Sequence, residues 1–197
     1  MKTKIAVLVS GGGTNLQALI DAQGKTLLSG EIVLVVSNNP GAYALERAKK
    51  AGIETAVVTK KEWGSQAAFE AKLKEILTDH GIQLIILAGF MTILSAEFTS
   101  CYPRRILNIH PSLIPSFCGP GYYGLRVHEE ALRRGVKVTG ATVHFVNEVC
   151  DGGPILLQKA VEVLPDDTPE ALQKRVMEQA EWKLLPQAIA MVCNGEA

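Results

Sequence analysis

Apolar residues along the chain alternate between two patterns, one typical of buried strands and the other of amphipathic helices. Continuous runs of β-branched and aliphatic residues predict strands that are covered on both faces. Segments with apolar residues three or four apart predict helices. The predicted strands are 4–10, 31–37, 55–59, 82–88 and 105–109, and helices are predicted from residue 14 and over 42–51 and 65–80. This alternation predicts an α/β fold: a Rossmann-like, mostly parallel sheet with helices on both faces.

The pattern changes after residue 110. Residues 111–124 are rich in Pro, Gly and Tyr, which is typical of a loop. A helix is predicted over 125–134, and strands over 136–146 and 155–163, as an antiparallel addition in the C-terminal half. Thr168 and Pro169 predict the start of a last helix, with threonine as its cap. We therefore expect one domain over 1–197, with a Rossmann-like half at 1–110 and a second half at 111–197.

Composition narrows the class of protein. The apolar fraction of 47% supports a packed core, and the 20 basic residues balance the 20 acidic ones, which argues against a nucleic-acid partner. The four cysteines form no CxxC pair, so no metal site or disulfide scaffold is predicted. The first ten residues lack a cleavage pattern and are too short to span a membrane. We therefore expect a soluble cytoplasmic protein without a membrane partner.

A glycine-rich turn follows the first predicted strand. The sequence Gly11-Gly12-Gly13-Thr14-Asn15 lies between that strand and a helix, where backbone N–H groups and the helix N-terminus favour a phosphate group. A tight turn without a ligand is an equally good interpretation of this segment alone. The dinucleotide fingerprint does not fit, because Leu16 replaces its third glycine and no acidic residue ends the second strand. A phosphomonoester fits better than a nucleoside triphosphate, because the P-loop motif does not match either.

Asn108 and His110 are the strongest candidates for chemistry. They lie two residues apart at the end of a predicted strand, so their side chains project from one face. An amide donor beside an imidazole suits a reaction in which an oxyanion develops on a carbonyl carbon. Asp151, in an Asp-Gly-Gly turn, would raise the pKa of His110 if the fold brings the two together, and a protonated His110 could then donate to the oxyanion as Asn108 does. Asp151 could also relay, directly or through water, the proton that leaves an attacking amine. These residues predict acyl or formyl transfer to an amine, and we interpret His144 as a supporting residue.

Four segments resemble the folate-dependent formyltransferases, and within them the phosphoribosylglycinamide formyltransferases. They are 7–19, 88–94, 108–115 and 140–154, in that family's order, and the resemblance covers nearly the whole chain. It implies transfer of a formyl group from 10-formyltetrahydrofolate to the amine of glycinamide ribonucleotide, a step of purine biosynthesis. It also implies that Asn108, His110 and Asp151 are catalytic. We further expect a monomer or homodimer without a metal.

The resemblance further implies two sets of binding residues. The ribonucleotide contacts would be Gly13, Thr14, Asn15 and Glu181. The folate contacts would be Gln66, Met91, Thr92, Ile93, Leu94, Asn108, Asn147, Glu148, Val149, Cys150 and Asp151. The chain departs from the family at Gln66 and Thr92, where some members have arginine, and at Cys150, where an aliphatic residue is commoner. The loop over 117–124 is expected to close over substrate.

Three alternatives stay open. A formyltetrahydrofolate hydrolase would use water in place of the amine, and usually has an extra N-terminal domain, whereas this sequence begins at the first strand. A methionyl-tRNA formyltransferase usually adds a C-terminal domain and a basic surface. A phosphosugar-binding protein without activity would need the three candidate residues to be misplaced.

Overall fold

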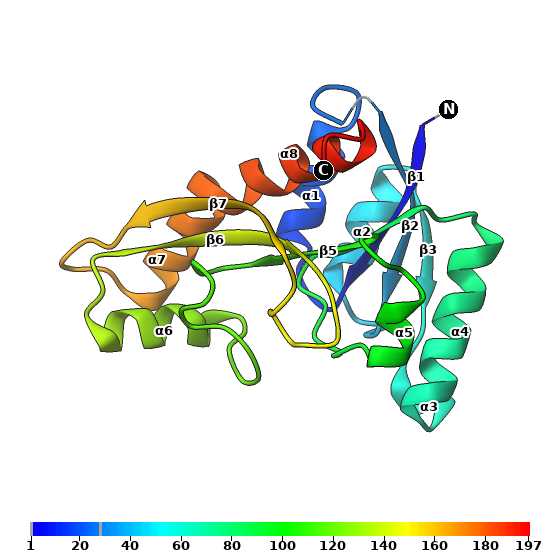
Figure 1. Ribbon diagram of the computed structural model, residues 1–197, viewed down its shortest axis with the longest axis horizontal. Coiled ribbons are helices and arrows are strands. Elements are labelled where there is room, and N and C mark those ends of the chain that lie inside the picture. The colour runs from blue at the N-terminus through cyan, green and yellow to red at the C-terminus, as the bar shows by residue number, and fades with distance from the viewer. Residues whose placement is uncertain (1, 28) are drawn as a thin grey trace.

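The computed structural model describes residues 2–27 and 29–197, so Met1 and Leu28 lie outside the described residues. Across the described ranges, a sheet has seven strands in the order β3-β2-β1-β4-β5-β6-β7 (Figure 1). Strands β1 to β5 pair in parallel, whereas β6 is antiparallel to both β5 and β7. The predicted fold class is therefore confirmed, including the antiparallel addition in the C-terminal half.

The predicted strands and long helices are all present. The strands are β1 (Thr3–Val9), β2 (Gly30–Ser37), β3 (Glu54–Val57), β4 (Leu84–Leu87), β5 (Ile106–His110), β6 (Val138–Phe145) and β7 (Ile155–Glu162). The helices are α1 (Thr14–Ala22), α2 (Tyr43–Lys50), α3 (Lys60–Trp63), α4 (Gln66–Asp79), α5 (Ala96–Ser100), α6 (Leu125–Arg134), α7 (Pro169–Val176) and α8 (Trp182–Cys193), with a π-helical turn η1 (Met177–Glu181) between the last two.

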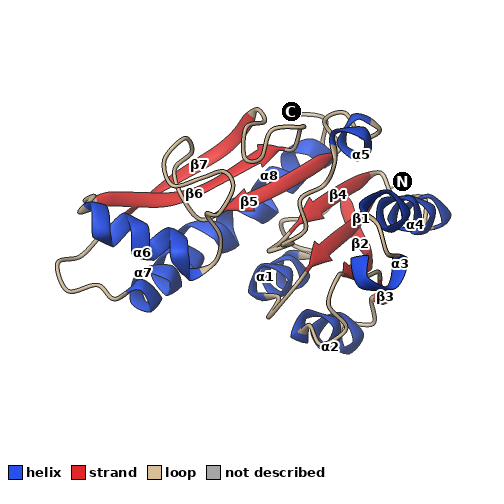
Figure 2. Cartoon of the chain, turned by 90° about the horizontal axis from the view of Figure 1, so that it is seen from below, coloured by secondary structure: helices blue, strands red, loops and turns tan. Residues whose placement is uncertain are grey.

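Helices cover the sheet from both sides, because successive strand residues point to opposite faces. In β1, Ile5 and Val7 pack in one core with α1, α2, α6, α7 and α8. Ala6 and Leu8 pack in the other core, where α4 and α5 supply Phe69 and Phe98. Figure 2 shows the two groups of helices on opposite sides of the sheet. The continuous apolar runs of the central strands therefore follow from their coverage on both faces.

Three helical features were not predicted. Helices α3 and α5 span four and five residues, too few for an apolar period to be recognised, although Thr59 and Ser95 cap them. The predicted last helix is divided by η1, within which the backbone widens from the α-helical to the π-helical pattern. Pro186 then lies inside α8, where it has no N–H for the carbonyl one turn earlier.

The strand order places the end of β1 beside the end of β4. The chain moves from β1 to β2 on one side of the sheet, and β4 lies on the other side of β1. In open α/β sheets, ligands bind in the crevice at such a reversal, outside the carboxyl ends of the strands. The glycine turn after β1, residues 88–91 after β4, and Asn108 and His110 of β5 all lie at this edge.

Candidate active site

A large cavity opens at this edge of the sheet. It has a volume of about 840 Å³, and its walls include Gly11 to Asn15, Asn108, His110, Asp151 and Glu181. A smaller cavity of about 100 Å³ adjoins it and shares Asn108, Cys150 and Asp151 with it. Asn108 and Asp151 therefore lie where the two cavities meet.

Asp151 contacts both Asn108 and His110, which is the condition for its predicted role. Asn108 Nδ2 lies 3.4 Å from Asp151 Oδ1, and His110 Nδ1 lies 3.6 Å from Asp151 Oδ2. The N–H of Gly119 donates to Asp151 Oδ2 at 2.8 Å, which holds the carboxylate from the side of the 117–124 loop. Asp151 has a φ of 54°, so its turn uses the left-handed region that aspartate tolerates. The structure therefore brings the three predicted catalytic residues together.

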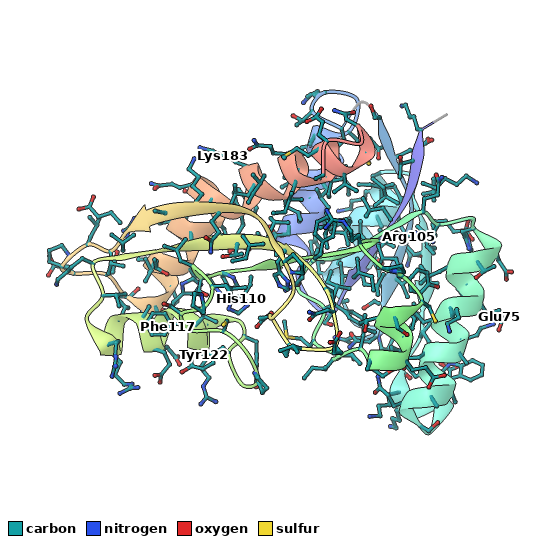
Figure 3. All side chains as sticks on the ribbon, viewed as in Figure 1. Glu75, Arg105, His110, Phe117, Tyr122 and Lys183 are labelled. Atoms are coloured by element: carbon teal, nitrogen blue, oxygen red, sulfur yellow. The ribbon has the colours of Figure 1, made fainter. Side chains whose placement is uncertain are left out.

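The hydrogen bonds of His110 define its tautomer. Nε2 lies 2.9 Å from the carbonyl oxygen of Phe117, which only accepts, so Nε2 carries a proton. Nδ1, the other ring nitrogen, faces Asp151. Figure 3 shows His110 near Phe117 and Tyr122, at the opposite end of β5 from Arg105. The neutral ring therefore presents the lone pair of Nδ1 beside the carboxylate.

Burial and charge act in opposite directions on His110. Burial lowers its pKa below the ordinary value, and Asp151 raises it by a smaller amount. The predicted effect of Asp151 is thus present, but the net shift is downward. For Asp151 itself, burial raises the pKa, but His144, His110 and the Gly119 N–H together lower it by a larger amount, so the net shift is downward. At neutral pH the pair is therefore a neutral imidazole beside an ionised carboxylate.

His144 completes the polar group. It pairs with Asn108 in the register of β5 and β6, and Asn108 Nδ2 donates to its Nε2 at 3.1 Å. Nδ1 of His144 lies 2.9 Å from the carbonyl oxygen of Phe145, so this nitrogen carries the ring's proton in the neutral form. Nε2 also lies 3.6 Å from Asp151 Oδ1. His144 thus orients the Asn108 amide, in agreement with a supporting role.

The glycine turn after β1 has one position that requires glycine. Gly13 has a φ of 73°, and a Cβ there would lie 2.6 Å from the Cβ of Ala44. At Gly11 and Gly12, an added Cβ would meet no atom of the described residues within 4 Å. Gly11 and Gly12 therefore leave room for a ligand, whereas Gly13 lets α2 approach the start of α1.

Asn15 and Glu181 meet across the large cavity although they lie 166 residues apart. Asn15 Nδ2 donates to Glu181 Oε2 at 2.7 Å. Burial raises the pKa of Glu181 to about 7, and the bond from Asn15 opposes that shift. The other amide atom, Asn15 Oδ1, is buried and has no hydrogen-bond partner among the described residues. An acceptor atom is thus left for a ligand's N–H or O–H group.

The residues predicted to contact folate lie around both cavities, with one exception. Met91 lines the large cavity and Ile93 lines both. The small cavity is further lined by Thr92, Leu94, Asn147, Glu148, Val149 and Cys150. Gln66 lines neither cavity. Its direct contact with folate stays a prediction.

Gln66 instead belongs to a hydrogen-bonded group that holds the 91–95 loop. Its Nε2 donates to Glu70 Oε1 at 2.6 Å and to the carbonyl of Ile93 at 3.1 Å. The buried carboxylate of Glu70 also accepts from the Ser95 N–H at 2.7 Å and from the Ser95 hydroxyl at 2.5 Å. At the other end of the loop, the Met91 N–H donates to Ser10 Oγ at 2.8 Å.

Several of these contacts have no signal in the sequence. Glu70 lies on a helix among other charged residues, and only the fold shows that its side chain is buried. The Phe117 carbonyl and the Gly119 N–H are backbone groups, which no side-chain pattern can indicate. His128, which also lines the large cavity, lies on the helix predicted over 125–134, and the sequence pattern indicates no role for it.

Fold and site together define a class of group-transfer protein, in which an amide, an imidazole and a carboxylate lie beside a glycine turn. A family profile described as formyl transferase matches residues 3–189. The chain therefore belongs to the formyl transferase family.

Comparison with individual relatives shows where in the family the chain belongs. The chain is 42% identical over 192 residues to the phosphoribosylglycinamide formyltransferase of Haemophilus influenzae, covering 98% of this chain and 88% of that protein. The crystal structure of glycinamide ribonucleotide transformylase 1 from Symbiobacterium toebii superposes with a TM-score of 0.92 at 42% identity, covering 98% of this chain and 89% of that one. Within its family, the chain thus falls among the phosphoribosylglycinamide formyltransferases.

Some relatives are much longer. The chain is 47% identical over 194 residues to the trifunctional purine biosynthetic protein adenosine-3 of Gallus gallus, covering 98% of this chain but 19% of that protein. The chain thus spans about a fifth of the length of that curated relative. Among the described residues, no helix is both long and apolar enough to cross a membrane.

Proposed function

We propose that this protein transfers the formyl group of 10-formyltetrahydrofolate to the amine of glycinamide ribonucleotide, giving formylglycinamide ribonucleotide and tetrahydrofolate in purine biosynthesis. One observation carries the proposal: the Asp151 carboxylate lies between His110, His144 and Asn108 where the two cavities meet. An acceptor in the large cavity and a formyl donor reaching into the small one would therefore meet at these side chains.

The two ligands fit different walls. The ribonucleotide phosphate would bind at Gly13, Thr14 and Asn15, where α1 presents unpaired backbone N–H groups. Glu181, beside Asn15, would contact the sugar. The folate would lie along 91–94 and 147–151, whose exposed apolar side chains include Ile93 and Val149. The names of the bacterial relatives support this choice of substrates.

The chemistry follows from the states of the side chains. The amine nitrogen attacks the formyl carbon, a C–N bond forms, and the formyl oxygen becomes an oxyanion. Asn108 would donate to that oxyanion, which replaces its long 3.4 Å contact with Asp151. The free Nδ1 of His110 would accept the proton that the amine loses, and Asp151 would stabilise the resulting imidazolium.

Collapse of the intermediate returns the proton. The bond from the formyl carbon to the folate nitrogen breaks, the carbonyl re-forms, and His110 donates its proton to the leaving nitrogen. One proton leaves the amine and one reaches tetrahydrofolate, so the reaction balances without a serine or cysteine nucleophile. Location in the cytoplasm, the monomeric or homodimeric state and the independence from a metal stay predictions.

A mixed assay tests the proposal against its rivals. Purified protein is incubated with 10-formyltetrahydrofolate, with and without glycinamide ribonucleotide, and tetrahydrofolate release is measured. We expect release only when the ribonucleotide is present. Release at an equal rate without the ribonucleotide would indicate a hydrolase. No release in either mixture, with binding of the ribonucleotide retained, would indicate a phosphosugar-binding protein without activity.

A further inference from the structure

His128 is a buried histidine without a hydrogen-bond partner. It lies in the second turn of α6, its exposed fraction is 0%, and it borders the large cavity. Within the described part of the chain, neither of its ring nitrogens has a partner. The chain's other three histidines each hydrogen-bond a backbone carbonyl: His80 that of Ile76, His110 that of Phe117 and His144 that of Phe145.

This arrangement is unfavourable in the ligand-free protein. A buried polar group without a partner loses its bonds to water and gains nothing in return. Burial, and to a smaller extent His110, lower the pKa of His128 to about 4, so the ring is neutral at pH 7. A neutral imidazole has one N–H donor and one acceptor nitrogen. His128 therefore offers both kinds of hydrogen bond to a group that enters the cavity.

The surroundings of His128 indicate which ligand that is. Gln173, Met177 and Glu181, from α7 and η1, line the same cavity, and α7 packs against α6. Asn15 Oδ1 is another buried atom of this cavity without a partner among the described residues. A ligand with its phosphate at Gly13 to Asn15 and its amine at His110 must place its sugar and amide groups between these ends.

We propose that His128 hydrogen-bonds the hydroxyl or amide groups of the phosphosugar acceptor, between its phosphate and its attacking nitrogen. This inference rests on the proposed function, because it takes the acceptor to be a ribonucleotide. His128 is then a binding residue for the acceptor, and its lost hydrogen bonds are recovered only in the complex.

The proposal predicts an unusual combination of effects for His128→Leu. Leucine removes the unpaired nitrogens, so the melting temperature of the ligand-free protein should stay equal or rise. The same change removes the partner of a buried ligand group, so the ribonucleotide Kd should rise about tenfold. His128→Gln, which keeps a donor and an acceptor, should bind more tightly than His128→Leu. If His128 serves only in packing, its replacement by leucine should instead lower the melting temperature and leave the ribonucleotide Kd unchanged.

Calorimetric titration measures the binding, with glycinamide ribonucleotide and with ribose 5-phosphate as separate ligands. Weaker binding of both by His128→Leu supports a contact with the sugar, and weaker binding of the ribonucleotide alone supports a contact with its glycinamide. Unchanged binding of both overturns the inference. Failure of the wild-type protein to bind the ribonucleotide would instead overturn the proposed function.

His80→Leu is the matched control. His80 has a partner for each ring nitrogen and lies far from the cavity in sequence and fold, so its loss should lower the melting temperature and leave binding unchanged. If His128→Leu does not fold, NMR of the histidine rings in the wild-type protein tests the inference instead. The nitrogen resonances of the His128 ring should shift when the ribonucleotide binds, whereas those of His80 should not. An unshifted His128 ring would overturn the inference.

Discussion

At the scale of single residues, the site is governed by competition between burial and partners. Burial lowers the pKa of His110 more than Asp151 raises it, and burial raises the pKa of Glu181 against the bond from Asn15. His110 is thereby neutral at pH 7, and Glu181, whose pKa is about 7, is protonated in about half of the molecules at that pH. A neutral His110 can accept a proton, and a protonated Glu181 can donate a hydrogen bond.

The pH dependence of kcat/KM tests the state of His110. Because neutral His110 accepts the proton, kcat/KM should rise with pH through a pKa below 6.5. Asp151→Asn removes the charge that raises this pKa, so the rise should move to lower pH. The same variant should lower kcat by about two orders of magnitude, since it also removes the group that stabilises the imidazolium. A rise centred above 6.5, or one that Asp151→Asn leaves in place, would contradict this account.

The raised pKa of Glu181 predicts how the stability of the protein depends on pH. Its pKa is about 7 in the folded protein and near 4.5 when unfolded. A raised pKa stabilises the fold fully below the unfolded value, and this contribution is lost as pH rises through the folded value. Glu181→Gln removes the ionisation, so the free energy of unfolding of wild type relative to this variant should fall between about pH 4.5 and 7, by at most about 3 kcal/mol. Parallel stability curves for the two proteins, measured by urea unfolding, would refute the shift.

Much of the site at this scale was predictable from the sequence. Asn108 and His110 were found because a period of two places them on one strand face. Their contact with Asp151 was not derivable, because 43 residues separate Asn108 from Asp151 and only the fold joins them. The net pKa of His110 was not derivable either, because it depends on burial by the whole site.

At the scale of elements, two neighbouring glycines in the turn between β1 and α1 have different roles, one in ligand binding and the other in packing. Gly12 and Gly13 are neighbours, but only Gly13 has a positive φ and a close neighbour in α2. Gly13→Ala should lower the free energy of unfolding by about 2–4 kcal/mol, through left-handed strain and the contact with Ala44. Gly12→Ala is the control and should leave stability within about 0.5 kcal/mol while weakening phosphate binding. Equal melting temperatures for both variants would argue against this difference.

The contact of α4 with the 91–95 loop makes a second prediction at this scale. Glu70→Ala leaves the Ser95 hydroxyl and N–H without their acceptor, so stability should fall by about 2 kcal/mol. The loosened loop should raise KM for the folate several-fold and leave KM for the ribonucleotide unchanged. Glu75→Ala is the control, because Glu75 lies on the exposed side of the same helix (Figure 3). Equal rises in both KM values would point to a general loss of structure.

The elements themselves followed from their apolar patterns wherever they were long. The π-helical turn η1 could not be predicted, because its residues continue the apolar spacing of the helices on either side. The helices on either side of it pack against different partners, α7 against α6 and α8 against α1. These are contacts between distant segments, which local periodicity does not contain.

At the scale of the whole molecule, two cavities are joined by one carboxylate. The large cavity is formed by the ends of β1, β4 and β5 together with α6, α7 and η1, and the small one by the 91–94 and 147–151 loops. Asp151 lines both. The central claim is therefore that a formyl group passes between ligands held on either side of this residue.

The fate of the formyl carbon tests that claim most directly. The protein is mixed with glycinamide ribonucleotide and with 10-formyltetrahydrofolate whose formyl carbon carries an isotope label, and the products are followed by NMR and mass spectrometry. His110→Ala serves as the control for transfer without the protein's catalysis. The account predicts that the label appears on the ribonucleotide amine, in a one-to-one ratio with the tetrahydrofolate released. Label recovered mainly as formate, or retained on the folate, would contradict it.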